Sequence, residues 1–343
     1  MSEAPLILGT RGSELALAQA RLTESALSDA GIDCEIKVIK TIGDKRPDLK
    51  LSEFSTALPG VHDKGVFTKE LEEALLSGEI DFAVHSLKDV PTELSEAFEI
   101  CATLPRAPIA DVFLTTEEGL AKDLTLLGQT PNPVKSETKE GMVRDLTLLT
   151  QKTVATSSVR RARQLGWLFR GVEVVDIRGN VPTRIRKLIQ NSNWTGILLA
   201  RAGLERLGIY SPEKAYFEFE GTRVFAVELP VDWFLPAAGQ GAVGIEILKS
   251  NARARGALDQ INDRLTFQQT CAERAFLARL EAGCQTPVGV STWFENEEAI
   301  LAMKVRVFDE SDVSAEPRQA EASGPSADPG GLADTLMHLL EST

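Results

Sequence analysis

The chain has 343 residues, 43% of them hydrophobic and 25% charged, which suits a globular protein with two or three domains. Its formal net charge of −13 disfavours binding to nucleic acid or to anionic membranes, because such a protein repels polyanions on average. The four cysteines and three histidines lack metal-site spacing and no apolar run is long enough to cross a bilayer, so we expect neither a metal nor a membrane partner.

The first half of the chain alternates between short apolar runs and amphipathic segments, which predicts strands followed by helices. Strands are expected at residues 6–9, 34–42, 81–85, 112–115 and 153–156. One helix is expected after Ser13, which can cap its first turn, and another over 67–76, where Gly78 ends the pattern. Residues 43–65 and 117–152 are polar and irregular, so we expect a mobile loop and a surface insertion.

The alternation continues to about residue 260, and the remainder has a different pattern. Helices are expected at 159–169, 182–191, 251–261 and 264–282, and strands at 173–177, 195–200, 224–229 and 243–248. A further short helix, which ends at Leu207, is expected after the strand 195–200. Strands near 288–293 and 299–308, a polar stretch at 309–331 and a helix at 332–341 follow. This order predicts two α/β domains and a small α+β domain. We place domain 1 at 1–108 and 238–260, domain 2 at 109–237 and domain 3 at 261–343.

Basic and other polar residues gather where predicted strands pass into helices. In open α/β sheets these places border the ligand site, helix N-termini favour anions, and arginine matches the geometry of a carboxylate. The residues concerned are Arg11, Ser13, Lys88, Ser158, Arg160, Arg161, Arg178, Asn180, Arg184 and Arg206. Together they predict a crevice for a ligand with several negative groups. Arg163, Arg186 and Lys187 are expected on outer helix faces, in solvent.

Two further residues are candidates for chemistry. Asp89 follows a buried strand and could stabilise a positive charge on a substrate, or could simply cap the turn before Pro91. Cys284 follows a predicted helix on a loop and could be a reactive thiol or a buried, inert one. We expect structural roles for Cys34, Cys101 and Cys271.

Residues 239–244 match the pattern G-x-G-x-x-G of dinucleotide-binding proteins. That fingerprint follows a strand and opens a helix, whereas here the glycines lead into the predicted strand 243–248. We therefore predict no nicotinamide or flavin site. We expect these glycines to let the backbone pass closely between two domains.

Seven blocks, in order along the chain, resemble the porphobilinogen deaminase (hydroxymethylbilane synthase) family. They are LGTRGS (8–13), DFAVHSLKDVP (81–91), TSSVRR (156–161), IRGNVPTR (177–184), AGLERLG (202–208), PAAGQGAVG (236–244) and EAGCQTPVG (281–289). The resemblance spans residues 6 to about 290 and is loose beyond 289. Seven blocks in register are far more specific than any single short motif.

The resemblance implies an enzyme of tetrapyrrole and heme biosynthesis, a transferase. It joins four porphobilinogen molecules head to tail into hydroxymethylbilane and releases ammonia. A dipyrromethane cofactor, attached to Cys284 by a thioether, primes the chain. Asp89 takes the place of the catalytic carboxylate that contacts pyrrole N–H groups and steadies the azafulvene cation formed as ammonia departs. The fold expected is two domains with mixed five-stranded sheets, like type 2 periplasmic binding proteins, plus a small α+β C-terminal domain.

The remaining site residues match positions that hold acetate and propionate groups in this family. Those expected to bind the cofactor are Lys88, Ser13, Ser158, Arg160, Arg161, Arg178, Arg184 and Asn180, and those expected to bind the substrate are Arg11, Gln19, Arg206, Arg178 and Arg184. Each pyrrole brings two carboxylates, so an arginine-lined crevice suits the growing polyanion. A thiolate is a suitable nucleophile for anchoring an electrophilic methylene carbon.

The sequence also departs from the family, and it admits other classes of protein. The loop 55–65 is longer than in compact members although it keeps Lys64, and 117–152 has no counterpart. An exported binding protein for a polycarboxylate would need neither Cys284 nor Asp89, and the chain shows no signal peptide. A nucleic-acid-binding protein would need aromatic platforms. We expect a cytoplasmic monomer whose partner is the small molecule porphobilinogen.

Overall fold

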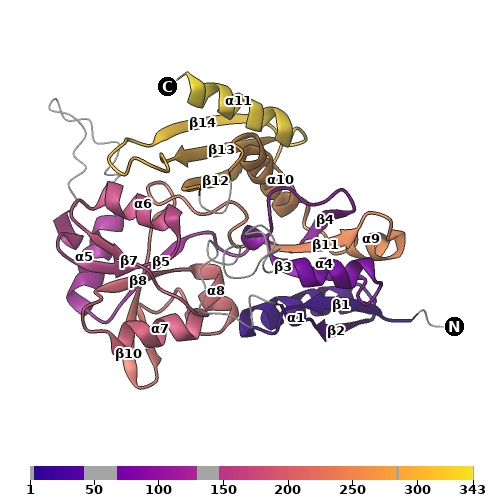
Figure 1. The fold of residues 1–343 in the computed structure, drawn as a ribbon, viewed down its shortest axis with the longest axis horizontal. Coiled ribbons are helices and arrows are strands. Elements are labelled where there is room, and N and C mark those ends of the chain that lie inside the picture. The colour runs from indigo at the N-terminus through magenta and orange to yellow at the C-terminus, as the bar shows by residue number, and fades with distance from the viewer. Residues whose placement is uncertain (1–3, 42–67, 130–146, 283–285, 343) are drawn as a thin grey trace.

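The computed structural model describes residues 4–41, 68–129, 147–282 and 286–342. Its strands form three separate sheets with helices packed on each of them (Figure 1). In this view the sheet near the N-terminus and the second sheet lie side by side, and the third, near the C-terminus, lies above both. Within the described ranges, none of the helices combines the length and apolar character needed to span a membrane.

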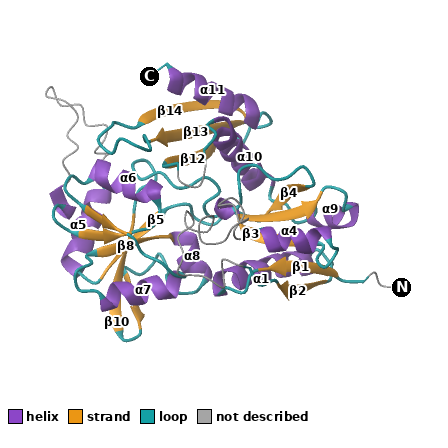
Figure 2. Ribbon diagram, viewed as in Figure 1, coloured by secondary structure: helices purple, strands orange, loops and turns teal. Residues whose placement is uncertain are grey.

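The first sheet has the strand order β2-β1-β3-β11-β4. Its members β1 and β2, and β1 and β3, are parallel, whereas β11 runs antiparallel to both of its neighbours (Figure 2). The side chains of β3 alternate between the two faces. Phe82 packs with helices α1 and α9, and Ala83 packs with α4 on the opposite face. The elements are β1 (Leu6–Thr10), α1 (Glu14–Asp29), β2 (Cys34–Val38), α4 (Lys69–Leu76), β3 (Phe82–Ser86), the 3₁₀ turn η2 (Leu87–Asp89), β4 (Phe98–Thr103), β11 (Val243–Leu248) and α9 (Ala252–Leu258).

The second sheet has the order β7-β6-β8-β5-β10-β9. It has six strands rather than the five expected from the resemblance, because residues 216–219 pair with β10 as an additional edge strand. Helices α5 and α6 cover one face and α7 and α8 cover the other. The elements are β5 (Asp111–Thr115), α5 (Glu118–Gly128), η4 (Thr147–Leu149), β6 (Thr153–Ala155), α6 (Val159–Leu168), β7 (Glu173–Val175), α7 (Val181–Gln190), β8 (Gly196–Ala200), α8 (Arg201–Arg206), β9 (Tyr216–Phe219) and β10 (Thr222–Glu228).

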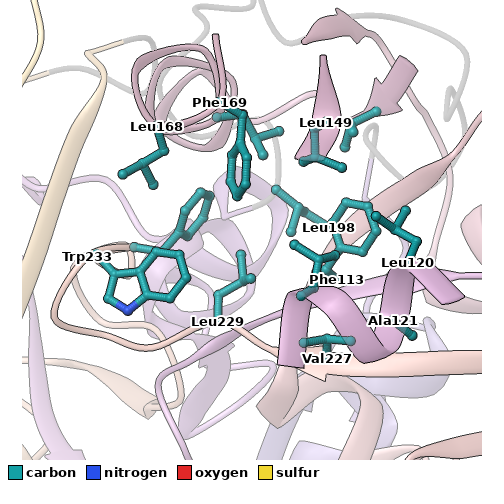
Figure 3. Packing of buried hydrophobic residues seen from close by; sticks show 14 of the residues in the cluster. Phe113, Leu120, Ala121, Leu149, Leu168, Phe169, Leu198, Val227, Leu229 and Trp233 are labelled. Atoms are coloured by element: carbon teal, nitrogen blue, oxygen red, sulfur yellow. The ribbon is translucent and has the colours of Figure 1, made fainter. Parts of the chain in front are cut away.

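The segment 117–152 was expected to be a surface insertion, and this prediction was wrong for its two ends. Helix α5 turns Leu120 and Leu124 into the core beside the second sheet, and Leu149 of η4 joins the same cluster. Figure 3 shows these ends packing with Phe113 and Phe169. The apolar positions recur every three to four residues, which is the period of a helix with one buried face. Residues 130–146 lie outside the described ranges.

The third sheet is antiparallel with the order β12-β13-β14. Its strand β14 lies within the stretch 309–331, where no strand was expected. That stretch is rich in small polar residues, and β14 is a strand because it pairs along its length with β13. Helices α10 and α11 bury Phe276 and Leu336 against this sheet. The elements are α10 (Arg264–Arg279), β12 (Val288–Glu295), β13 (Ile300–Val307), β14 (Arg318–Pro325) and α11 (Pro329–Glu341).

The glycine-rich segment before β11 crosses the segment that leads from β4 to β5. The backbone N–H of Ala107 donates to the carbonyl oxygen of Gly241 at 3.1 Å. Gly241 has φ +83°, and a Cβ atom there would lie 2.3 Å from the carbonyl oxygen of Ala107. Only glycine permits this approach. The close backbone approach expected of these glycines is confirmed for Gly241, and the segment leads into strand β11 as predicted.

Candidate active site

Lys88 and Asp89 lie on the 3₁₀ turn η2, directly after β3. Leu87 and Val90 on either side are buried, so the turn leaves the two charged residues exposed between two apolar anchors. Gln19 of α1 lies just behind, where its amide exchanges hydrogen bonds with the hydroxyl of Ser86 at 2.9 and 3.1 Å. Gln19 is 2% exposed, so in this conformation it supports the turn from inside.

The ammonium group of Lys88 lies among charges from the second sheet. The residue is exposed, yet desolvation by the protein around it lowers the pKa of Lys88 to about 8. Asp89 favours the charged form, whereas Arg161 and Arg160 oppose it. The first and second sheets therefore contribute to one electrostatic environment around η2.

Arg184, in the first turn of α7, belongs to the same environment. Burial, together with the neighbouring Arg161 and Arg178, lowers the pKa of Arg184 to about 10, while Asp89 opposes the shift. Its Nε donates to the carbonyl oxygen of Gly179 at 2.7 Å. Arg178 donates from Nε to Asp176 at 3.0 Å. Within the described ranges, the terminal nitrogens of Arg178 and Arg184 have no hydrogen-bond acceptor, so both retain the paired N–H groups that bind a carboxylate.

Arg160 and Arg161 have a different environment from the one expected for ligand-binding arginines. Each is 5% exposed, and both bind the fully buried carboxylate of Asp111 at 2.7–2.8 Å. Arg160 also donates to the carbonyl oxygen of Leu235, and Arg161 donates to that of Leu198. Burial by itself would raise the pKa of Asp111, but the two guanidiniums hold it well below the usual range. In this conformation the pair joins α6 to the core of the protein.

Three polar residues that were expected to bind the ligand act as helix caps. The side chains of Ser13, Ser158 and Asn180 accept hydrogen bonds from the backbone N–H groups of Ala16, Arg161 and Thr183. Each helix therefore begins where the predicted anion site was placed, with its positive dipole end directed there.

The remaining predicted residues lie near the junction of the first two sheets or outside the described ranges. Arg11 follows β1 and is half-buried. Arg206 donates to the carbonyl oxygen of Gly241 at 2.6 Å, and burial lowers its pKa to about 10 while Glu205 opposes the shift. The structure does not describe Cys284 or the loop that carries Lys64, so it shows nothing about either.

The other cysteines are free thiols on buried or half-buried positions. Burial raises the pKa of Cys34 to about 11 and that of Cys101 to about 12, which keeps both thiols protonated and unreactive at neutral pH. Among the residues for which the structure gives positions, no cluster of histidine, cysteine, aspartate or glutamate is arranged to hold a metal ion.

Sequence reasoning missed the ion pairs that join the parts of the protein. Arg106 donates two hydrogen bonds of 2.7 and 2.9 Å to Glu273 of α10, and Oε2 of that carboxylate also accepts from the backbone N–H of Gly239. Asp111 was missed as well. An acidic residue at the start of the apolar strand 112–115 was the available signal, because a carboxylate at such a position needs partners.

These features define a three-sheet α/β protein whose basic side chains suit a ligand with several carboxylates. Residues 6–256 match the family model "Porphobilinogen deaminase, dipyromethane cofactor binding domain", and residues 267–340 match "Porphobilinogen deaminase, C-terminal domain". The chain therefore belongs to the porphobilinogen deaminase family. Members of this family are transferases of tetrapyrrole biosynthesis that make hydroxymethylbilane, and their main domain binds a dipyrromethane cofactor.

Curated relatives agree with the family models. The chain is 38% identical over 324 residues to porphobilinogen deaminase of Moorella thermoacetica, with 92% of this chain and 90% of that protein covered. It is 35% identical to the enzyme of Syntrophobacter fumaroxidans, with 100% and 96% covered. Among solved structures, substrate binding domain 2 of Lactococcus lactis GlnP is 10% identical, with a TM-score of 0.37 and 82% of this chain and 93% of that one covered.

Proposed function

We propose that this chain joins porphobilinogen units at a site where Asp89 is the catalytic carboxylate and Lys88, Arg178 and Arg184 hold the acid groups of the pyrroles. One observation carries the proposal: Asp89 lies exposed on η2 beside the first sheet, and its charge opposes the lowering of the pKa of Arg184, which belongs to the second. A carboxylate close to guanidinium groups is the chemical complement of a pyrrole, which offers an N–H group and two carboxylates.

The described residues fit the dipyrromethane cofactor, a ligand with several carboxylates. Its acid groups would accept from the terminal nitrogens of Arg178 and Arg184 and from the ammonium of Lys88. The N-termini of the helices capped by Ser13 and Ser158 add favourable dipoles. When bound, the cofactor supplies the pyrrole α-carbon to which the first substrate is joined.

Asp89 acts on the substrate. Its carboxylate accepts hydrogen bonds from pyrrole N–H groups and stabilises the positive charge that develops as the aminomethyl C–N bond breaks and ammonia leaves. The methylene carbon of the substrate then bonds to the free α-carbon of the neighbouring pyrrole, and this α-carbon loses its proton. A placed carboxylate typically contributes about 10²–10⁴ in rate to such proton transfer, and the arginines contribute by fixing the two pyrroles in contact.

Asp89→Asn tests this role because it removes the charge and preserves the shape. We expect the variant to retain the cofactor, visible as a two-ring adduct in the intact mass, and to lose at least about a hundredfold in kcat, within the range for a placed carboxylate. Near-normal turnover would remove Asp89 from the mechanism.

Cys284 is the attachment point of the cofactor in this proposal, supported by its place in the block 281–289 and by the family match that includes it. Cys284→Ala should give a chain with the mass of the bare polypeptide. Cys34→Ala is the matched control, because Cys34 is a free, half-buried thiol, and it should keep the adduct. An adduct that survives in Cys284→Ala would exclude this anchor.

The same proposal includes the domain division and the setting of the enzyme. The three sheets support domain 1 at 1–108 and 238–260, domain 2 at 109–237 and domain 3 at 261–343. The free thiols of Cys34, Cys101 and Cys271 support a reducing, cytoplasmic compartment. The chain acts as a monomer and does not bind nucleic acid. The net charge of −13 supports this, because it repels polyanions. Light scattering of the purified protein tests the monomer.

A further inference from the structure

Arg274 lies on α10, a helix that packs on the third sheet, and its side chain reaches the segment that follows Asp89. Its Nη2 donates to the carbonyl oxygens of Pro91 at 2.7 Å and Thr92 at 2.9 Å, and its Nη1 donates to that of Val90 at 3.3 Å. One guanidinium therefore binds three consecutive carbonyl groups, beginning one residue after Asp89. None of these contacts is to a carboxylate, so their effect is to fix backbone.

Beyond the hydrogen bonds between Gln19 and Ser86, the turn that carries Asp89 has a small apolar cluster as support. The cluster consists of Leu87, Val90 and Ala242, with Leu94 and Ile100 packed against it. Two backbone hydrogen bonds also hold the turn, from Leu87 to Ala242 and from Val90 to Leu87. An open pocket of about 260 Å³ lies on the side toward α10, lined by residues that include Leu87, Phe267, Cys271 and Arg274. Packing is therefore incomplete where the guanidinium makes its contacts.

Burial makes this use of an arginine costly. It lowers the pKa of Arg274, although Cys271 and Glu246 favour the charged form. A half-buried guanidinium whose bonded partners are these backbone groups is stabilised by the carbonyl oxygens that it binds. The arrangement ties the position of residues 90–92 to α10, and any displacement of that backbone moves Asp89 with it.

We propose that Arg274 is a positioning residue that holds Asp89 in its working place through the carbonyl groups of residues 90–92. This inference rests on the proposed role of Asp89. It adds that the C-terminal part of the chain, through α10, sets the geometry of a reaction centre on the first sheet. Such control is effective because a displacement of about 1 Å can cost a hundredfold in rate.

Arg274→Gln and Arg274→Lys test the proposal in the cofactor-loaded enzyme, with Arg264→Gln as control. Arg264 is an exposed arginine on the same helix and bonds to Gln268 and Glu298. We expect Arg274→Gln to lower kcat by about tenfold to a hundredfold with KM within about threefold, and Arg264→Gln to match the parent. Arg274→Lys should recover part of the loss, because an ammonium can bind some of the same carbonyls.

Two readouts separate positioning from a general structural effect. Hydrogen exchange at the amides of residues 87–90 and 92 should speed up in Arg274→Gln and not in Arg264→Gln, with the two-ring mass adduct retained in both. In an Asp89→Glu background the carboxylate is already displaced, so Arg274→Gln should cost less than about threefold in kcat.

Three results would overturn the proposal. The first is that Arg274→Gln lowers kcat by the same factor in the parent and in the Asp89→Glu background. The second is that hydrogen exchange in the segment 87–92 is unchanged, and the third is that kcat falls only in proportion to the loss of the mass adduct. If Asp89→Asn alone has the parent's kcat, the role of Asp89 itself fails. If that variant is impaired while Arg274→Gln is not, only the positioning role fails. Arg274→Lys, which conserves the charge, serves the same comparison if Arg274→Gln does not fold.

Discussion

The carboxylate of Asp111 is completely buried between two guanidiniums, and its removal should have a large effect. It accepts from Arg160 at 2.8 Å, from Arg161 at 3.1 and 2.7 Å, and from Gln240 at 3.0 Å. Asp111→Asn keeps the shape and one acceptor oxygen but leaves Arg160 and Arg161 without a counter-charge. Removing one partner of a buried ion pair typically costs about 3–5 kcal/mol, because the remaining charge stays desolvated. We expect the free energy of unfolding to fall by about that amount.

The contribution of Asp111 should also depend on pH in a defined direction. The two arginines hold its folded pKa well below the value of about 3.9 for an unfolded aspartate. Its stabilisation is therefore fully present above that unfolded value and is lost as the pH falls toward the folded one. The difference between the parent and Asp111→Asn should be constant from about pH 5 to 8 and shrink below about pH 4.

Urea unfolding followed by circular dichroism measures both effects. Asp123→Asn, on the exposed side of α5, is the control for removing an aspartate from the same part of the chain. Because a chain of this size can unfold in more than one step, the comparison uses the transition that includes the second sheet. A loss below about 1 kcal/mol for Asp111→Asn would refute the argument that this carboxylate balances two buried guanidiniums.

The other predictions concern binding and the crossing backbone. Arg184→Leu should raise KM by at least about tenfold, as expected for a lost charged hydrogen bond, whereas Arg186→Leu on the same helix, whose partner is Glu220, should not. Equal KM values would exclude Arg184 from binding. Burial lowers the pKa of Lys88 to about 8, so the ammonium loses its charge, and KM should rise, between about pH 7 and 9. Lys88→Arg should abolish this rise, because arginine stays charged. A KM that does not change with pH in the parent would contradict the prediction. Gly241→Ala should destabilise the fold by at least about 1 kcal/mol, because the positive φ and the nearby carbonyl oxygen of Ala107 leave no room for a Cβ atom. Thermal unfolding measures this, and an unchanged melting temperature would refute the close passage.

Local patterns were sufficient to predict most helices and strands. Ser13, Ser158 and Asn180 accept capping hydrogen bonds at the starts of three helices, as their residue types suggest. The pattern was insufficient for β14, because the residues that it turns toward the core are the small Ala320 and Ala322, which give only a weak hydrophobic alternation. Its pairing with β13 makes it a strand. Helix α5 was missed for another reason: polar residues around it concealed a short apolar stripe formed by Leu120 and Leu124.

The residues of the candidate site could be selected from the sequence, but their environments could not. Lys88 and Arg184 were chosen as basic residues at strand–helix junctions. The fold places Arg184 within the electrostatic reach of Asp89, and places both Lys88 and Arg184 within that of Arg161. Arg160 and Arg161 were chosen by the same rule, yet they bind Asp111, which lies 49 and 50 residues away along the chain. The roles proposed for these residues in binding stay predictions.

Periodicity, caps and motif order act over a few residues, and for that reason the sequence by itself determined the α/β class, the family and the set of charged residues. Charge partners and buried surroundings depend on which distant segments meet. Only the tertiary structure could therefore show that Gln19 supports Ser86, that Asp111 binds two arginines and that Arg274 extends from α10 to the backbone beside Asp89.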